Sequence, residues 1–176
     1  MEFKELIIER RSIRKYQAYD IPKEDLEEII KDSLYAPSWK NSETARYYIA
    51  NSKEAIAEVK EALPDFNINS SNNANLVITT FKKEISGFNP DHTPSNELGD
   101  LWGAYDLGLA NAYFILKAKD KGYDTLIMGL RDADKLRKIF NIPEDEIIVS
   151  VIALGKKEND AKLNPRKDVD EVLIIK

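Results

Sequence analysis

The stretch from Glu97 to Lys121 constrains the fold of this 176-residue chain more than any other part of it. With Gly122 as its natural terminator, the stretch predicts a helix of about two dozen residues. One apolar stripe on that helix comprises Leu98, Leu101, Trp102, Tyr105, Leu109, Ala112, Tyr113 and Leu116, and a second face adds Leu107, Ala110, Phe114 and Ile115. A helix that is apolar on more than one face must be buried.

Two arrangements would bury such a helix in a chain of this size. It is either the central core helix of a monomer, or a second subunit packs against it. The small residues Gly103, Ala104 and Gly108 would let another backbone approach closely. We therefore place burial in a dimer ahead of the monomer.

Helical and strand periods alternate along the rest of the chain, with no internal repeat and no interdomain linker. They indicate one α+β or α/β domain over residues 1–176. We expect helices at Phe3–Arg10, Pro22–Leu34, Lys53–Leu63 and Asp132–Phe140, and strands at Arg46–Ala50, Leu76–Phe81, Asp124–Met128 and Ile147–Leu154. We also expect a long loop at 85–99, a polar arm at 155–168 and a last strand at 171–175.

Several classes of protein do not fit this composition. There is no cysteine, which excludes disulfides, thiolate metal sites and cysteine nucleophiles, and His92 is the only histidine. The net charge of -5 argues against a nucleic-acid binder, because such proteins need a basic surface. No apolar run is long enough to span a membrane or to act as a signal peptide, so we expect a cytoplasmic protein.

Positive charge is concentrated in one place, the run from Arg10 to Lys15, where the first helix ends. Arginine presents a planar fork of donors that suits phosphate oxygens, and Ser12 adds a hydroxyl. The run is therefore a candidate anion site. Taken alone, it is better explained as a solvated basic turn, because short charge runs usually interact with water.

A second cluster, Ala36 to Ser42, follows the second helix with the letters APSWKNS. Its proline, small residues and amide are typical of a loop. Such a loop can present backbone donors and the Asn41 amide to a planar heterocycle. No glycine pattern in the chain matches the usual dinucleotide or nucleotide-phosphate motifs.

Together, and in this order, the two clusters resemble the opening of the FMN-dependent nitroreductase family. RRSIRKY and APSWKN match its usual patterns R-R-S-x-R-x-[FY] and A-P-S-x-x-N-x-Q-P-W. YDLGLANAYFILKAKDKGYDTLIMG is similar to the family's long central helix and the turn after it, and NPRKDVDEVL is similar to its C-terminal arm. The resemblance thus covers nearly the whole chain.

The resemblance implies an α+β fold in which helices flank a central antiparallel or mixed sheet. It also implies an intertwined homodimer with FMN at the subunit interface, each chain being one FMN-binding domain. NADH or NADPH would be the co-substrate, and a nitroaromatic, quinone or similar small molecule would accept the electrons. Because the flavin carries hydride through N5 in a ping-pong reaction, no catalytic side chain and no metal is expected.

The resemblance implies that Arg10, Ser12 and Arg14 contact the phosphate and ribityl chain of FMN. It implies Arg166 as a further phosphate ligand. We include Arg11 among these candidate cofactor-binding residues. For the isoalloxazine, it implies Pro37, Ser38, Trp39 and Asn41, contributed by the other subunit. Asn67 matches a position that bonds the pyrimidine edge, and the backbone of Met128 and Gly129 would lie against flavin N5 and O4.

The sequence departs from the family pattern at Glu43-Thr44-Ala45, where Gln-Pro-Trp is usual, and at Trp39, where the residue is often small. These departures leave three alternatives open. The chain could carry out other flavin chemistry, such as reductive dehalogenation or flavin fragmentation. It could also store or sense FMN without turnover, or be an interaction module without flavin.

Overall fold

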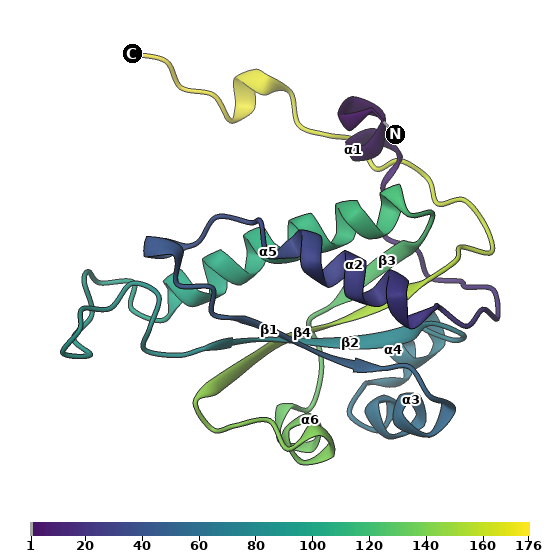
Figure 1. Ribbon diagram of the computed structural model, residues 1–176. Coiled ribbons are helices and arrows are strands. Elements are labelled where there is room, and N and C mark those ends of the chain that lie inside the picture. The colour runs from purple at the N-terminus through teal and green to yellow at the C-terminus, as the bar shows by residue number, and fades with distance from the viewer. Residues whose placement is uncertain (1) are drawn as a thin grey trace.

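The computed structural model describes residues 2–176 and contains a four-stranded sheet between two layers of helices (Figure 1). The strands are β1 (Ala45–Ala50), β2 (Asn75–Lys82), β3 (Asp124–Met128) and β4 (Glu146–Gly155). They lie in the order β1-β2-β4-β3, and every pair is antiparallel. The expected α+β fold with an antiparallel central sheet is therefore confirmed.

Helices cover both faces of the sheet. On one face lie α2 (Lys23–Ser33) and α5 (Leu101–Asp120), and on the other lie α3 (Lys53–Lys60), α4 (Asp65–Ser70) and α6 (Ala133–Phe140) (Figure 1). Two hydrophobic cores result because successive strand residues point to opposite faces. Val77 packs in the α2–α5 core with Phe114, and Ile78 packs in the other core with Leu136.

The long helix α5 has two unlike faces. Leu107, Ala110 and Phe114 are buried in the chain. Much of the predicted apolar stripe lies on the opposite side, where Leu101 and Tyr105 are 63% and 59% exposed. A single chain therefore buries only one of the two apolar faces that the sequence predicts.

The sequence suggested that Gly103 allows the backbone of a second subunit to approach, but the structure gives this glycine a different role. A Cβ on this residue would lie 2.3 Å from the ring of Phe81, so the glycine lets α5 approach its own sheet. Gly108, by contrast, has open space around its Cα. Gly122 has φ +83° and ends the helix as expected.

Most predicted boundaries agree with the structure to within a few residues, and Asp132 caps α6 through the amide of Lys135, as expected. The expected helix at Glu97 begins later, at Leu101. The short helix α4 was not expected. The strand predicted at 171–175 was wrong: Val169–Glu171 form a 3-10 turn, and the exposed residues after it pair with no strand.

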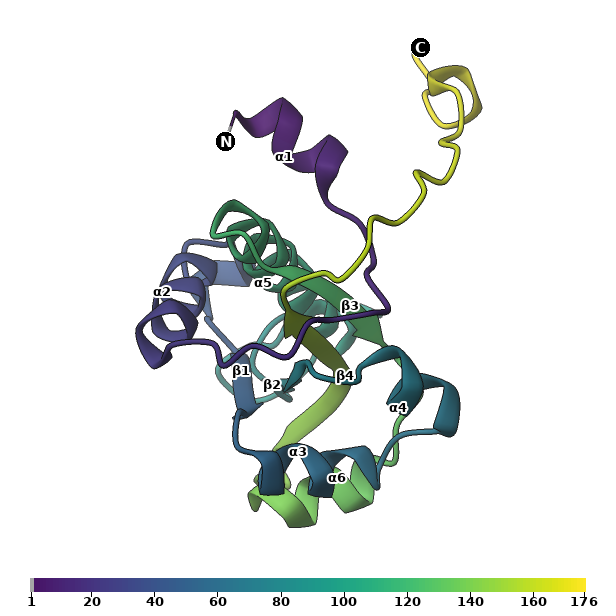
Figure 2. The same ribbon diagram turned by 90° about the vertical axis from the view of Figure 1, so that its right-hand side faces the viewer.

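Two arms leave the body on the α5 side of the sheet (Figure 2). One is α1 (Phe3–Glu9), which buries none of its own residues, and the other is the C-terminal segment after residue 161. Ile174 and Ile175 on this segment are 86% and 82% exposed. Within residues 2–176, no helix is both long and apolar enough to cross a membrane.

Candidate functional site

The basic run leaves α1 and continues beside β3 as an extended segment. Ser12 forms a parallel bridge with Thr125, and the amide of Ile13 donates to the carbonyl of Thr125 at 3.0 Å. Burial of Ile13 and Tyr16 anchors the segment on the sheet. Because side chains alternate along an extended chain, Ser12 and Arg14 face away from the side on which Ile13 is buried.

Arg14 lines a cavity of about 290 Å³ at the end of β3. The opposite walls are Asn67 from α4 and Met128 and Gly129 from the turn that follows the strand. Four of the residues predicted to bind the cofactor, distant in sequence, thus meet in one place. Gly129 is exposed, and apart from its chain neighbours no atom lies within 4 Å of the position that a Cβ would take.

Asn67 connects two walls of this cavity. Its side chain is 7% exposed, and its Nδ2 donates to the carbonyl of Leu130 at 3.0 Å. That bond ties α4 to the turn after β3. The helix itself begins after Pro64, and Ser71 bonds its last turn through the carbonyl of Asn67 at 2.8 Å.

Arg10 and Arg166 approach each other from two segments, but neither they nor Ser12 line the cavity with Arg14. Partial burial lowers the pKa of Arg10, and repulsion by Arg166 and then Arg11 lowers it further. The C-terminal segment is guided there by pairing with the extended segment, since the amide of Glu158 donates to the carbonyl of Lys15 at 3.0 Å. Like charges have thus been brought close enough to repel one another.

Arg11 points elsewhere. Its guanidinium turns back onto the end of α1 and donates to the carbonyls of Ile8 and Arg10. It also lines a separate polar cavity with Asp124 and Lys157. The structure therefore does not bring Arg11 to the cavity that Arg14 lines.

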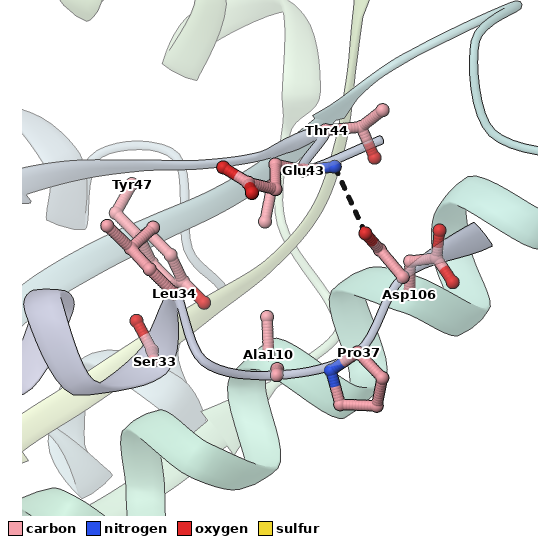
Figure 3. Close-up of a pocket in the computed structure, with 11 residues that line it drawn as sticks. Ser33, Leu34, Pro37, Glu43, Thr44, Tyr47, Asp106 and Ala110 are labelled. Carbon is pink, nitrogen blue, oxygen red and sulfur yellow. Dashed lines mark hydrogen bonds between the residues drawn. The ribbon is translucent and has the colours of Figure 1, made fainter. Parts of the chain in front are cut away.

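The second predicted cluster lies at the other edge of the sheet. Residues 36–44, here called the 36–44 loop, lead into β1, whereas Met128 and Gly129 follow β3. Three strand spacings, about 14 Å, separate these two edge strands. Pro37 and Ser38 instead line a small cavity against Asp106 and Ala110 of α5 (Figure 3).

Trp39 and Asn41 form a 3-10 turn within this loop. The ring of Trp39 packs on that of Trp102, with centroids 4.5 Å apart. The amide of Asn41 donates to Glu43 Oε1 at 2.8 Å. Within one chain, none of the four predicted residues of this loop lies in the cavity with Arg14.

Sequence reasoning missed Asp106, on which this loop depends. The carboxylate is 5% exposed, and it accepts hydrogen bonds from the backbone of Trp39 at 2.9 Å and from Ser86 at 2.5 Å. A signal was present, because an aspartate inside a helix with two apolar faces is expensive to bury unless donors reach it.

The residues near Arg14 fit a flavin mononucleotide. Within residues 2–176, no carboxylate forms an ion pair with Arg10, Arg14 or Arg166, so their charge is available to a phosphate. The cavity is slightly smaller than the roughly 300 Å³ at which ligand pockets begin, and it opens to solvent beside Gly129. A planar ring system placed there would remain exposed on one side.

Comparison with known proteins gives a consistent result. The model of the nitroreductase family matches residues 7–156. A protein from Archaeoglobus fulgidus named as an NADH dehydrogenase or NAD(P)H nitroreductase is 27% identical over 161 residues, which are 88% of this chain and 86% of the relative. One from Bacillus subtilis named as an NAD(P)H nitroreductase is 25% identical over 201 residues, covering 97% of this chain and 96% of the relative.

The fold has solved counterparts. A crystal structure of an Exiguobacterium sibiricum protein, described as a nitroreductase in complex with FMN, superposes with a TM-score of 0.87. The match covers 100% of this chain and 98% of that one, at 20% sequence identity. At this identity, the likeness shows a shared fold.

Proposed function

This chain belongs to the nitroreductase family, and we propose that it is a homodimeric oxidoreductase that binds FMN and takes electrons from NADH or NADPH. The observation that carries the proposal is the meeting of Arg14, Asn67, Met128 and Gly129 around one cavity. Arg10, on the same segment as Arg14, lies near Arg166, and neither forms an ion pair with a carboxylate of residues 2–176. We propose that each chain, over residues 1–176, forms one FMN-binding domain.

The phosphate end of the site is built from Arg10, Ser12, Arg14 and Arg166. Burial lowers the pKa of Arg10 most, and repulsion by Arg166 lowers it further, so the approach of these two guanidinium groups costs electrostatic energy in the free protein. A dianionic phosphate removes that repulsion, and each charge-assisted hydrogen bond contributes about 1.5–3 kcal/mol. Arg11 has a different role, since it closes the end of α1.

The ring end of the site lies at Met128, the last residue of β3, which still pairs with Val151, and at Gly129, the first residue beyond the sheet ladder. Asn67 keeps this turn in place by bonding Leu130. When bound, FMN supplies hydride transfer at N5, which no side chain of this protein can provide. The protein's part is to hold the ring and to leave one face open for the nicotinamide and the acceptor.

A second copy of the chain would complete the site. The outer face of α5 exposes Leu101, Tyr105 and Tyr113, and an open groove of about 740 Å³ separates α1 from α5. A seven-residue helix that buries nothing is not stable alone in water. These observations support a dimer in which α1, α5 and the C-terminal segment pack on the partner, and the 36–44 loop of the partner subunit walls the flavin.

The acceptor is proposed to be a nitroaromatic, a quinone or a similar planar molecule. Such an acceptor and the nicotinamide would use the same open face in turn, so the initial-velocity lines for the two substrates should be parallel. Intersecting lines would contradict a shared pocket.

The first test is the absorbance spectrum of the protein after incubation with FMN and desalting. We expect a yellow protein whose flavin band bleaches when NADH or NADPH is added without oxygen. Protein that stays colourless overturns the proposal, and yellow protein that neither nucleotide bleaches indicates storage or sensing instead.

Riboflavin provides a matched control because it lacks only the phosphate. If Arg10, Arg14 and Arg166 hold that phosphate, FMN should bind at least about a hundredfold more tightly than riboflavin. Equal affinities would show that the basic run plays no part.

A further inference from the structure

Asp106 is a buried charge placed under a loop rather than in the cavity described above. It lies one turn into α5, with Gly103 and Leu107 buried beside it. A single oxygen, Oδ2, accepts from the backbone N–H of Trp39 at 2.9 Å and from the hydroxyl of Ser86 at 2.5 Å, with the hydroxyl of Ser42 at 3.5 Å. Burial of a carboxylate is tolerated only with such donors.

The loop above this carboxylate has a strained backbone. Lys40, Asn41 and Glu43 have φ of 50°, 56° and 47°, which is the left-handed region. Side chains other than glycine are strained in this region, although asparagine is strained less. A conformation of this kind persists only where surrounding contacts hold it.

The contacts that hold the loop converge on Asp106. Inside the loop, the amide of Glu43 donates to the hydroxyl of Ser38 at 3.1 Å, the bond that is dashed in Figure 3. Beyond the loop, the hydrogen bonds that residues 37–42 make to other elements of the described chain end on the Asp106 carboxylate. Figure 3 shows Asp106 and Ala110 on α5, facing the loop.

The same carboxylate also holds a second loop, residues 83–99. Ser86 is 1% exposed and reaches Asp106 from that loop. Trp102 packs on Trp39 and donates from Nε1 to Asn96 at 2.9 Å. Both loops therefore take their position from one turn of α5.

We propose that Asp106 is a positioning residue for FMN binding, which acts by holding the 36–44 loop in the shape that walls the flavin of the partner subunit. This inference rests on the proposed function, because the loop meets the flavin only in the dimer. Asp106 does not touch the cofactor. Without the carboxylate, the left-handed residues of the loop relax, and the wall loses its shape.

The experiment compares Asp106→Ala and Asp106→Asn with Asn111→Ala as a matched control. Asn111 lies further along α5, is 7% exposed, and its amide approaches Thr79 of the sheet rather than either loop. FMN affinity is measured by flavin fluorescence titration of protein stripped of FMN. Loop order is measured separately by the rate of trypsin cleavage after Lys40 in the stripped protein.

We expect Asp106→Ala to weaken FMN binding about tenfold or more and to speed cleavage after Lys40 by a similar factor. Asp106→Asn retains an oxygen that can accept the same hydrogen bonds, so it should restore most of both values. Asn111→Ala should lower the unfolding temperature and leave both values near those of the wild type.

The outcomes separate this inference from the proposed function. Wild-type protein that binds no FMN contradicts the proposed function. If the wild type binds FMN and folded Asp106→Ala binds it equally well, the positioning role is wrong. If Asp106→Ala does not fold, Asp106→Ser takes its place, because serine is too short to reach the loop and can bond its own helix.

Discussion

Arginines that lack carboxylate partners are the main residue-scale feature of the candidate site. Several lysines elsewhere on this acidic protein are paired with carboxylates: Lys117 reaches Glu28 at 2.8 Å and Asp32 at 2.9 Å, and Lys157 reaches Asp160 at 2.6 Å. Arg10, by contrast, is partly buried beside other arginines, and its pKa is lowered. A protein with net charge -5 that leaves these cations together keeps them available for an anion.

Replacing Arg14 should test that role directly. Arg14→Ala removes a donor from the cavity wall, and we expect the Kd for FMN to rise about 10- to 100-fold. The adjacent Lys15→Ala removes the same charge from an exposed side chain that does not line the cavity. The Kd of each variant for FMN is measured by fluorescence titration. An equal rise in both Kd values would contradict the role assigned to Arg14.

At the scale of secondary-structure elements, α2 and α5 are joined by a stripe of ion pairs along their exposed border. Lys121 reaches Glu28 at 2.6 Å and Asp25 at 2.9 Å, and Lys117 also contacts Glu28. Hydrogen bonds from Lys117 and then Lys121 lower the pKa of Glu28, and a hydrogen bond from Tyr123 is the main cause of the lowered pKa of Asp25. These pairs reinforce the apolar contact beneath them.

The stripe makes stability depend on pH in the acid range. A carboxyl group whose pKa is lower in the folded state stabilises the fold above its unfolded pKa, and this stabilisation is lost as pH falls through the folded pKa. We therefore expect the urea midpoint of the wild type to fall between about pH 5 and pH 3, and Glu28→Gln to reduce that fall. Glu58→Gln, on the exposed side of α3, is the control and should retain the wild-type profile.

The close approach of α5 to the sheet gives a second prediction at this scale. Gly103→Ala would place a Cβ 2.3 Å from the Phe81 ring, which should lower the free energy of unfolding by about 1–3 kcal/mol. Phe81→Leu makes room at the same contact. If the cause is steric, the double variant should lose less free energy of unfolding than the two single variants lose together. Strictly additive losses would contradict a steric cause.

At the scale of the whole molecule, two arms and one helix face are left without cover in a single chain. Helix α5 lies on the same side of the sheet as α1 and the C-terminal segment (Figure 2), and its Leu101 and Tyr105 are exposed. Exposed apolar surface of this extent marks an interaction site. A twofold dimer would use the same surface on both copies.

We expect the wild type to elute with twice the 20.1 kDa mass of the chain when size-exclusion chromatography is combined with light scattering. Leu101→Glu places a charge on the outer face of α5 and should yield a monomer that has lost most of its FMN affinity. Ala57→Glu puts the same charge on an exposed position of α3, across the sheet, and should remain dimeric. A Leu101→Glu monomer that binds FMN normally would show that the site needs no partner.

Local patterns predicted most of the elements. Alternation and apolar runs identified all four strands, and capping and breaking residues such as Asp132 and Gly122 gave helix ends that the structure confirms. The run at 171–175 misled because its strand propensity is real, but in the structure its residues are exposed and pair with no strand of the described chain. Helix α4 was missed because six residues carry too little periodicity to be recognised.

The sequence by itself determined the basic run and the two-faced helix and narrowed the fold to α+β or α/β, because these depend on residue type and local spacing; the resemblance to a known family favoured α+β. Only the tertiary structure decided that Arg14, Asn67 and Gly129 share a cavity, that Arg11 turns away, and that Gly103 faces its own sheet. It also showed that Asp106 holds the 36–44 loop. Contacts of this kind join residues far apart in the chain, and their geometry follows from how strands and helices pack rather than from any local pattern.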